Sequence, residues 1–151
     1  MRILRVVALT ALAVFVVIQF VPYGWWHENP PVERDTPWPT ARAAEIARVS
    51  CYDCHSNESE WPAYSYVAPM SWLVHKDVAE GRGKLNFSEW PLNDKELDKA
   101  VDVVEDGGMP PGSYTFIHRD AKLTDDEARV LIDALESLGG SADEDHSGPG
   151  R

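Results

Sequence analysis

The chain has 151 residues and a mass of 16.9 kDa, which is enough for one domain of ordinary size. Its formal net charge of -11 at pH 7 would repel phosphate backbones, so nucleic-acid binding is excluded as a main role. Two cysteines are too few for a disulfide scaffold or a four-thiolate metal site, whereas 44% hydrophobic residues indicate a folded chain.

Residues 1–27 are typical of a membrane anchor. Residues 6–21 carry no charge, and Arg2 and Arg5 lie on their N-terminal side. A helix from Ile3 to Val21 would rise about 28 Å, close to the hydrocarbon thickness of about 30 Å. A cleaved signal peptide is the alternative, but no small-x-small site follows the apolar run. We therefore predict an uncleaved, single-pass transmembrane helix in the inner (cytoplasmic) membrane, with the later residues on the periplasmic side.

Three segments follow this anchor in the sequence. Residues 28–39 are rich in proline, which predicts a stiff, extended spacer. Residues 40–138 contain the apolar periodicity of a folded domain. Residues 139–151 have no large apolar side chain, which predicts a disordered acidic tail.

The signals within residues 40–138 are helical, and the fold class is predicted to be all-α. Helix starts are indicated by Thr40, by Pro69, and by two capping boxes, Asn93 with Glu96 and Thr124 with Glu127. The expected helix ends are Gly81, Gly107 and Gly139. Four short helices leave a small core, and the long aromatic loop at 57–68 predicts that the domain wraps a cofactor.

Both cysteines fall in the pentapeptide Cys51-Tyr52-Asp53-Cys54-His55, which is the attachment signature of c-type haem. Two thiols at this spacing can reach the two vinyl groups of one haem, and the adjacent histidine can ligate the iron. We predict one covalent haem c bound by Cys51, Cys54 and His55. Zinc binding, thiol redox chemistry and a disulfide are the alternatives, although zinc lacks further ligands here and a dithiol enzyme lacks its βαβ setting.

The sixth iron ligand is predicted to be Met109. This residue follows Gly107-Gly108 and precedes Pro110-Pro111, which indicates a rigid loop able to present a thioether to the metal. The alternative ligands are Met70, His75 and His118. A sixth position occupied by water is a further alternative.

Several segments together resemble the small bacterial haem-binding domain family of c-type cytochromes. They are the stretch 51–58 with Trp61-Pro62, and the stretches 68–74, 80–82, 85–90, 108–111 and 123–124. The resemblance covers roughly residues 41–138. It implies a cytochrome c-like helical domain around one haem, in a membrane-tethered monohaem protein with His55 and Met109 as axial ligands.

These observations lead us to expect a periplasmic one-electron carrier rather than an enzyme. A peroxidase-like haem enzyme, or a haem-based redox or gas sensor with a displaceable sixth ligand, is the alternative function. Redox proteins with a basic docking surface are the expected partners, because the chain is acidic. We further expect Tyr52 and Asp53 to face solvent, Phe87 and Trp90 to pack on the haem, and Arg82, Lys84 or Trp90 to bind a propionate.

Overall fold

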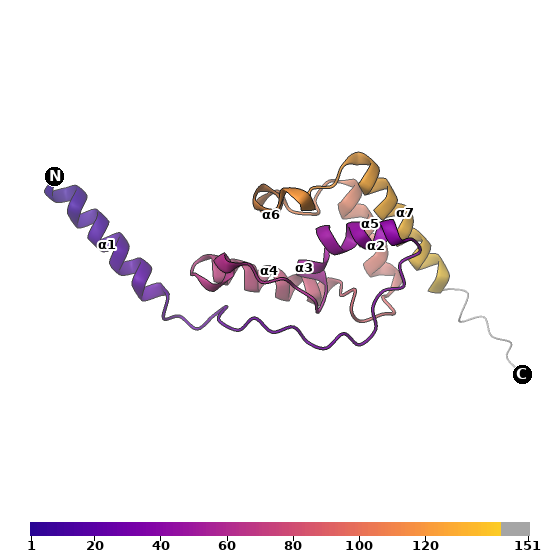
Figure 1. Cartoon of the computed structure of the whole chain (residues 1–151), viewed down its shortest axis with the longest axis horizontal. Helices are drawn as coiled ribbons and strands as arrows, with labels where there is room; N and C mark the ends of the chain where they lie inside the picture. The colour runs from indigo at the N-terminus through magenta and orange to yellow at the C-terminus, as the bar shows by residue number, and fades with distance from the viewer. Residues whose placement is uncertain (143–151) are drawn as a thin grey trace, which may run out of the picture.

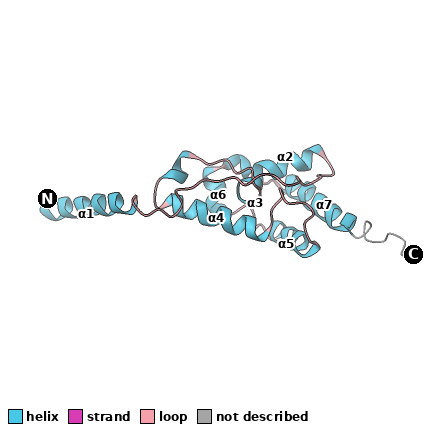
Figure 2. Ribbon diagram, turned by 90° about the horizontal axis from the view of Figure 1, so that it is seen from below, coloured by secondary structure: helices cyan, strands magenta, loops and turns pink. Residues whose placement is uncertain are grey.

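The computed structural model describes residues 1–142, and it shows an all-α chain (Figures 1 and 2). Among these residues there is no strand, only an isolated bridge between Arg34 and Glu89. The predicted all-α class is therefore confirmed. The elements are α1 Arg2–Ile18, α2 Ala41–Ser50, α3 Tyr52–His55, η1 Ala63–Tyr66, α4 Met70–Lys84, α5 Asp94–Glu105, α6 Gly112–Ile117, η2 Arg119–Ala121 and α7 Asp125–Ala142.

Local sequence signals position the starts of α2 and α5. The side chain of Thr40 accepts a hydrogen bond from the backbone N–H of Ala43 and caps α2. Asn93 and Glu96 form both bonds of the predicted capping box at α5. Helix α7 continues through Gly139 to Ala142, so the predicted end at Gly139 is wrong, and the first four residues of the expected tail are helical. Residues 143–151 of that tail lie outside the described part of the chain.

The apolar core lies on one side of the domain, where α5 packs against α7 and α2 crosses α7 (Figure 1). Leu131 is 0% exposed at its centre. Burying side chains of this size contributes about 1.5–3 kcal/mol each to stability. The largest aliphatic residues of the core are Ile46, Leu85, Leu92, Leu97, Val104, Leu131, Leu135 and Leu138.

The proline-rich segment is extended as expected, but it lies along the domain. Backbone N–H groups of Glu33 and Arg34 donate to the carbonyl of Ser88, and that of Thr36 donates to the carbonyl of Phe87. The side chain of Asn57 donates to the carbonyl of Pro31. The segment is thus fixed to the domain by hydrogen bonds and does not act as a free spacer.

Helix α1 projects away from the rest of the molecule (Figure 1). It has 17 residues and ends at Ile18, so its length is about 26 Å at about 1.5 Å per residue. No helix within residues 1–142 is both long and apolar enough to cross a membrane. The predicted transmembrane helix is therefore not supported, because the helical run stops before Pro22.

Candidate functional site

The cysteine–histidine motif lies at the junction of α2 and α3. Cys51 ends α2, and its carbonyl accepts hydrogen bonds from the backbone N–H groups of Cys54 and His55 at 3.2 and 2.9 Å. This single turn directs both cysteines and the histidine to one cavity. Helix α4 packs closely behind the turn, because a Cβ at Gly81 would lie 2.3 Å from the carbonyl oxygen of Cys54.

The cavity between α3, α4 and α6 has a volume of about 360 Å³, within the usual range for ligand sites of about 300–1,000 Å³. Met109 lines it together with the motif. Met70 lines it too, whereas His75 and His118 do not. Apolar side chains dominate its walls: Met70, Leu73, Val74, Met109, Pro110, Pro111 and Ile117.

The loop that follows α4 fixes the orientation of His55. Its Nδ1 lies 3.1 Å from the carbonyl of Leu85, and its own carbonyl accepts a hydrogen bond from the N–H of Phe87 at 2.8 Å. A proton on Nδ1 would leave Nε2 as the free lone pair of the neutral ring. Burial lowers the pKa of His55 below its ordinary value, which favours that neutral form.

Cys51 and Cys54 are both free and half-buried. Burial, with a smaller contribution from Cys54, raises the pKa of Cys51 to about 12. Burial, followed by the charges of Asp53 and Asp77, raises the pKa of Cys54 to about 11. Both groups are therefore neutral thiols at pH 7, which is unlike the low-pKa thiolates of dithiol redox enzymes.

Met109 lies on a tight loop after α5. The N–H groups of Gly108 and Met109 both donate to the carbonyl of Val103, at 2.8 and 3.1 Å. Gly107 has a positive φ of 66°, a conformation that favours glycine at a helix end. The side chain of Met109 is 37% exposed and also borders a second cavity of about 770 Å³ between this loop and α7.

Two phenols beside the cavity form pairs that the sequence analysis missed. The hydroxyl of Tyr114 donates to Asp53 at 2.5 Å, and that of Tyr64 lies 2.6 Å from Nε2 of His118. The rings of Tyr114 and His118 stack at 4.4 Å. Burial and the bond to Asp53 raise the pKa of Tyr114, so its hydroxyl stays protonated. These pairs join segments 54 and 61 positions apart, and no local pattern signals them.

Tyr52 does not face solvent, contrary to the sequence prediction, because it is only 2% exposed. Its ring stacks on Phe87, and its hydroxyl donates to Asp35 and accepts from Trp38. Asp53 is half-buried and lines the cavity. The motif therefore places one of its two intervening residues in the core and the other at the site.

The expected contacts of the loop after α4 are also corrected in part. Phe87 and Trp90 belong to the core and its margin, and neither lines the cavity. Arg82 is committed elsewhere, since its guanidinium donates to the carbonyls of Ser56 and Glu28 and to the side chains of Asn29 and Ser59. Lys84 is the one predicted propionate partner that reaches the cavity.

Comparisons with known proteins agree with this geometry. The model of the family described as a haem-binding domain matches residues 13–137. A cytochrome c peroxidase of Escherichia coli (strain K12) is 25% identical over 124 residues, which covers 73% of this chain. The chain spans 27% of the length of that relative. No solved structure matches.

The residues around the cavity fit a haem on two observations of this structure. Its walls are largely apolar, as a porphyrin requires. Two thiols and an imidazole whose Nδ1 is directed at the carbonyl of Leu85 line the same cavity. Among residues 1–142, no group of three or more His, Cys, Asp or Glu side chains is arranged to hold a metal ion.

Proposed function

The chain belongs to the haem-binding domain family, and from this premise we propose that it is a c-type, one-electron carrier. The observation that carries the proposal is the meeting of Cys51, Cys54, His55 and Met109 around one apolar cavity. When bound, a haem supplies reversible one-electron exchange at its iron.

Cys51 and Cys54 would attach the cofactor covalently. Each thiol would add across one vinyl group, so that its sulfur bonds to one carbon and its proton passes to the other. The addition consumes no oxidant and leaves no leaving group. Their burial next to α4 keeps both thiols neutral and within the cavity before attachment.

His55 would bind the haem iron through Nε2, since Nδ1 is already directed at the carbonyl of Leu85. Met109 is favoured as the second ligand over Met70. The loop that carries Met109 is fixed by two hydrogen bonds to the carbonyl of Val103, whereas Met70 is the first residue of helix α4. A histidine–methionine pair raises the reduction potential, which suits a carrier.

A peroxidase-like activity is the second candidate. The name of the Escherichia coli relative favours it, and so does the Tyr64–His118 pair, which places an imidazole one hydrogen bond from Tyr64 in the cavity wall. Such an enzyme needs a sixth position that is open or readily vacated. In the alternative role of a gas sensor, a gas would take the place of Met109.

Carbon monoxide binding to the reduced protein separates these functions. An electron carrier with a firmly bound Met109 should resist carbon monoxide, and Met109→Ala should bind it readily. Met70→Leu is the matched control from the same cavity, and it should behave like the parent. Ready binding by the parent, together with turnover of peroxide, would overturn the carrier proposal in favour of the enzyme.

We also propose that α1 holds the protein at the inner membrane, with the haem domain on the extracytoplasmic side. Its apolar side chains are exposed along its length, and Arg2 and Arg5 are its only charges. Support comes from the preference of such segments for lipid, with basic residues on the cytoplasmic side. Extraction of membranes with alkaline carbonate tests this tether, because a peripheral protein would be released.

The proposed partners are redox proteins with a basic surface. Asp53, Asp77 and Glu80 border the cavity together with one cation, Lys84, so the edge through which electrons would pass is acidic on balance. Complementary charge would mainly raise the association rate. Raising the ionic strength should therefore slow electron transfer to such a partner, since salt screens exposed charges.

A further inference from the structure

The junction between α1 and the domain is tightly bonded. The side-chain amide of Gln19 donates to the carbonyl of Ala68 at 3.1 Å and accepts from the N–H of Ala68 at 3.0 Å. This pair fixes the end of α1 to the residues that immediately precede α4. The junction is therefore a defined contact between segments 49 positions apart, not a flexible hinge.

Three further contacts reinforce the same junction. Gly24, with a positive φ of 76°, packs so closely on α4 that an added Cβ would lie 2.5 Å from the carbonyl oxygen of Ser71. The ring of Tyr23 meets His75 edge-on at 5.0 Å. The ring of His27 lies between Trp61 and Tyr66, at 4.5 and 4.1 Å.

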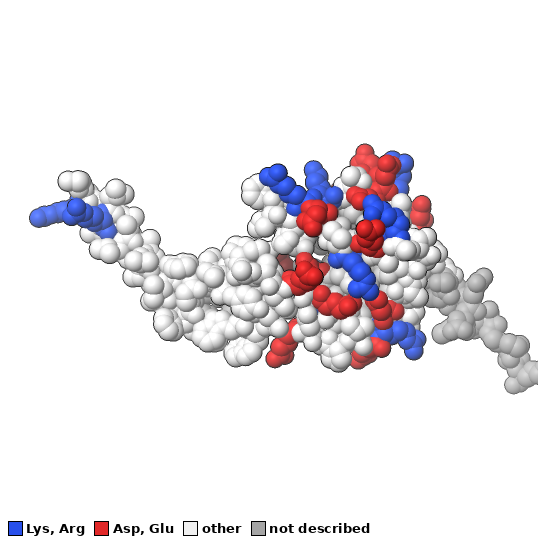
Figure 3. All heavy atoms as spheres, in the orientation of Figure 1, with Lys and Arg blue, Asp and Glu red and all other residues white. Residues whose placement is uncertain are grey.

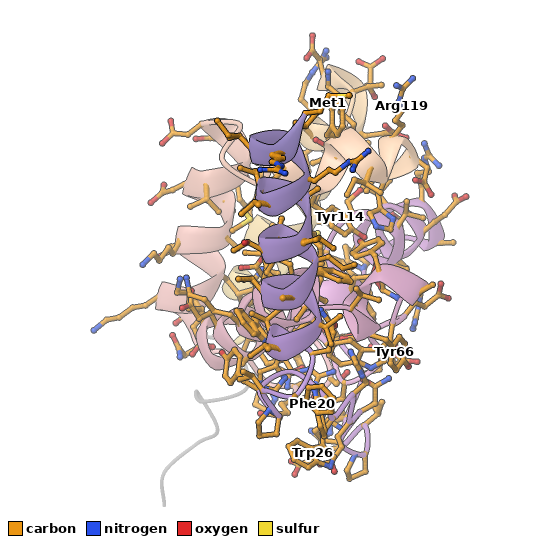
Figure 4. All side chains as sticks on the ribbon, turned by 90° about the vertical axis from the view of Figure 1, so that its left-hand side faces the viewer. Met1, Phe20, Trp26, Tyr66, Tyr114 and Arg119 are labelled. Atoms are coloured by element: carbon orange, nitrogen blue, oxygen red, sulfur yellow. The ribbon has the colours of Figure 1, made fainter. Side chains whose placement is uncertain are left out.

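Around this junction the surface is apolar and rich in aromatic rings. Trp26 is 63% exposed and Tyr66 is 61% exposed, although they come from distant segments. Figure 4 shows Phe20, Trp26 and Tyr66 grouped at the end of α1 that meets the domain. We call these exposed residues the collar: Phe20, Val21, Tyr23, Trp25, Trp26, Tyr66 and Val67.

The segments that form the collar carry no charged residues. Between Arg5 and Glu28 the sequence has no Lys, Arg, Asp or Glu, and none occurs from 61 to 75. In Figure 3 the charges occupy the free end of α1 and the far part of the domain, and the region between them is uncharged on this face. Exposed tryptophan and tyrosine without charge are typical of the headgroup layer of a bilayer.

We propose that the collar lies in the interfacial layer of a lipid bilayer and holds the haem domain in one orientation on the membrane. The inference rests on the proposed attachment through α1 and goes beyond it, because Tyr66 and Val67 belong to the domain itself. A tether alone would let the domain move freely. The Gln19–Ala68 pair and the packing of Gly24 instead join α1 and the domain as one body.

This orientation would place the haem cavity close to the bilayer surface. Val67 belongs to the collar, and Met70 and Leu73, in the first turn of α4, line the cavity. An electron partner that is itself embedded in the membrane could therefore reach the cavity without release of the domain.

Spin labels on the full-length, haem-loaded protein test the proposal in vesicles of zwitterionic and anionic phospholipid. Val67→Cys places the label in the collar, and Ser137→Cys places it on exposed α7, at the opposite side of the domain from α1 (Figure 1). Tyr66→Cys is a second collar probe in case Val67→Cys fails to fold. The parent chain, treated in parallel, gives the labelling background from Cys51 and Cys54.

The measured quantity is collision of the label with lipid-soluble oxygen relative to a water-soluble nickel complex. We expect this ratio to rise several-fold on vesicle binding for a collar label and to stay unchanged for Ser137→Cys. If the protein floats with vesicles but the collar label stays as accessible to nickel as in solution, the collar proposal is overturned and the tether stands. If the protein does not float, both are overturned. The haem absorption of each sample reports separately on the proposed electron carrier.

Discussion

The two sides of the domain are stabilised in different ways. Around α2, α5 and α7, large aliphatic side chains fill the interior, and Leu131 and Leu135 are almost completely buried. Around α3, α4 and α6 there is instead a cavity of about 360 Å³, lined by Leu73, Ile117 and two methionines that remain partly exposed. The first side is complete with its own residues. The second side leaves its apolar walls partly exposed, and Cys51, Cys54 and His55 line the same cavity.

The largest effect is expected when the proposed covalent attachment of haem to the cavity side of the domain is removed. Cys51→Ser combined with Cys54→Ser should abolish all haem that survives denaturation, because no thiol remains to form a thioether. Haem staining of a denaturing gel measures this loss. Each single variant is the matched control and should retain one linkage. Covalent haem in the double variant would contradict the assignment of both cysteines.

In the chain prepared without haem, protection from amide hydrogen exchange should differ between the two sides of the domain. We expect protection in α5 and α7 to persist, whereas that of α3, α4 and α6 falls by orders of magnitude, since local opening is easier where few apolar contacts are buried. Haem loading should restore protection in α4. Equal protection of both sides in the haem-free chain would show that the cavity needs no ligand for its stability.

Truncation of one leucine on each side compares the same two regions. Leu131→Ala should lower the free energy of unfolding by about 2–5 kcal/mol, because the residue is fully buried. Leu73→Ala, at a residue 45% exposed on the cavity wall, should cost about 0.5 kcal/mol without haem. Denaturant titrations with and without haem check both values. A loss at Leu73 that does not grow on haem loading would argue against contact with the cofactor.

At the contact between α3 and α4 we expect a smaller effect than that of Leu131→Ala. Gly81→Ala would force a Cβ against the backbone of Cys54 and should cost about 1–3 kcal/mol, with less efficient haem attachment. Gly83→Ala, on the same helix with open space around it, is the control and should be neutral or slightly stabilising. Equal stability of the two variants in thermal denaturation would contradict the close approach.

Most of the first side could be predicted from the sequence, because its signals are local. The capping box at Asn93 and the apolar spacing of α7 depend on residues a few positions apart. The end of α7 differs from the prediction, since the helix continues past Gly139 to Ala142. Helix α6 was missed because Gly112–Ile117 has no side-chain cap and no buried face.

The site itself was predicted in part. A contiguous motif supplies Cys51, Cys54 and His55, and the methionine-proline loop supplies Met109. The burial of Tyr52 depends on Asp35, Trp38 and Phe87, which the fold alone brings together. The sequence of the motif cannot reveal such partners. For the same reason the proline-rich segment was read as a spacer, although its partners are 26 and more positions away.

The central claim is that Cys51, Cys54, His55 and Met109 hold one covalent haem. The most direct test is visible absorption of the oxidised and reduced protein, produced with haem-attachment machinery and measured before and after denaturation. We expect a c-type spectrum that survives denaturation, with the far-red methionine–iron charge-transfer band in the native oxidised form. A spectrum that is lost from the chain on denaturation would contradict covalent attachment, and covalent haem without the far-red band would contradict Met109 as the sixth ligand.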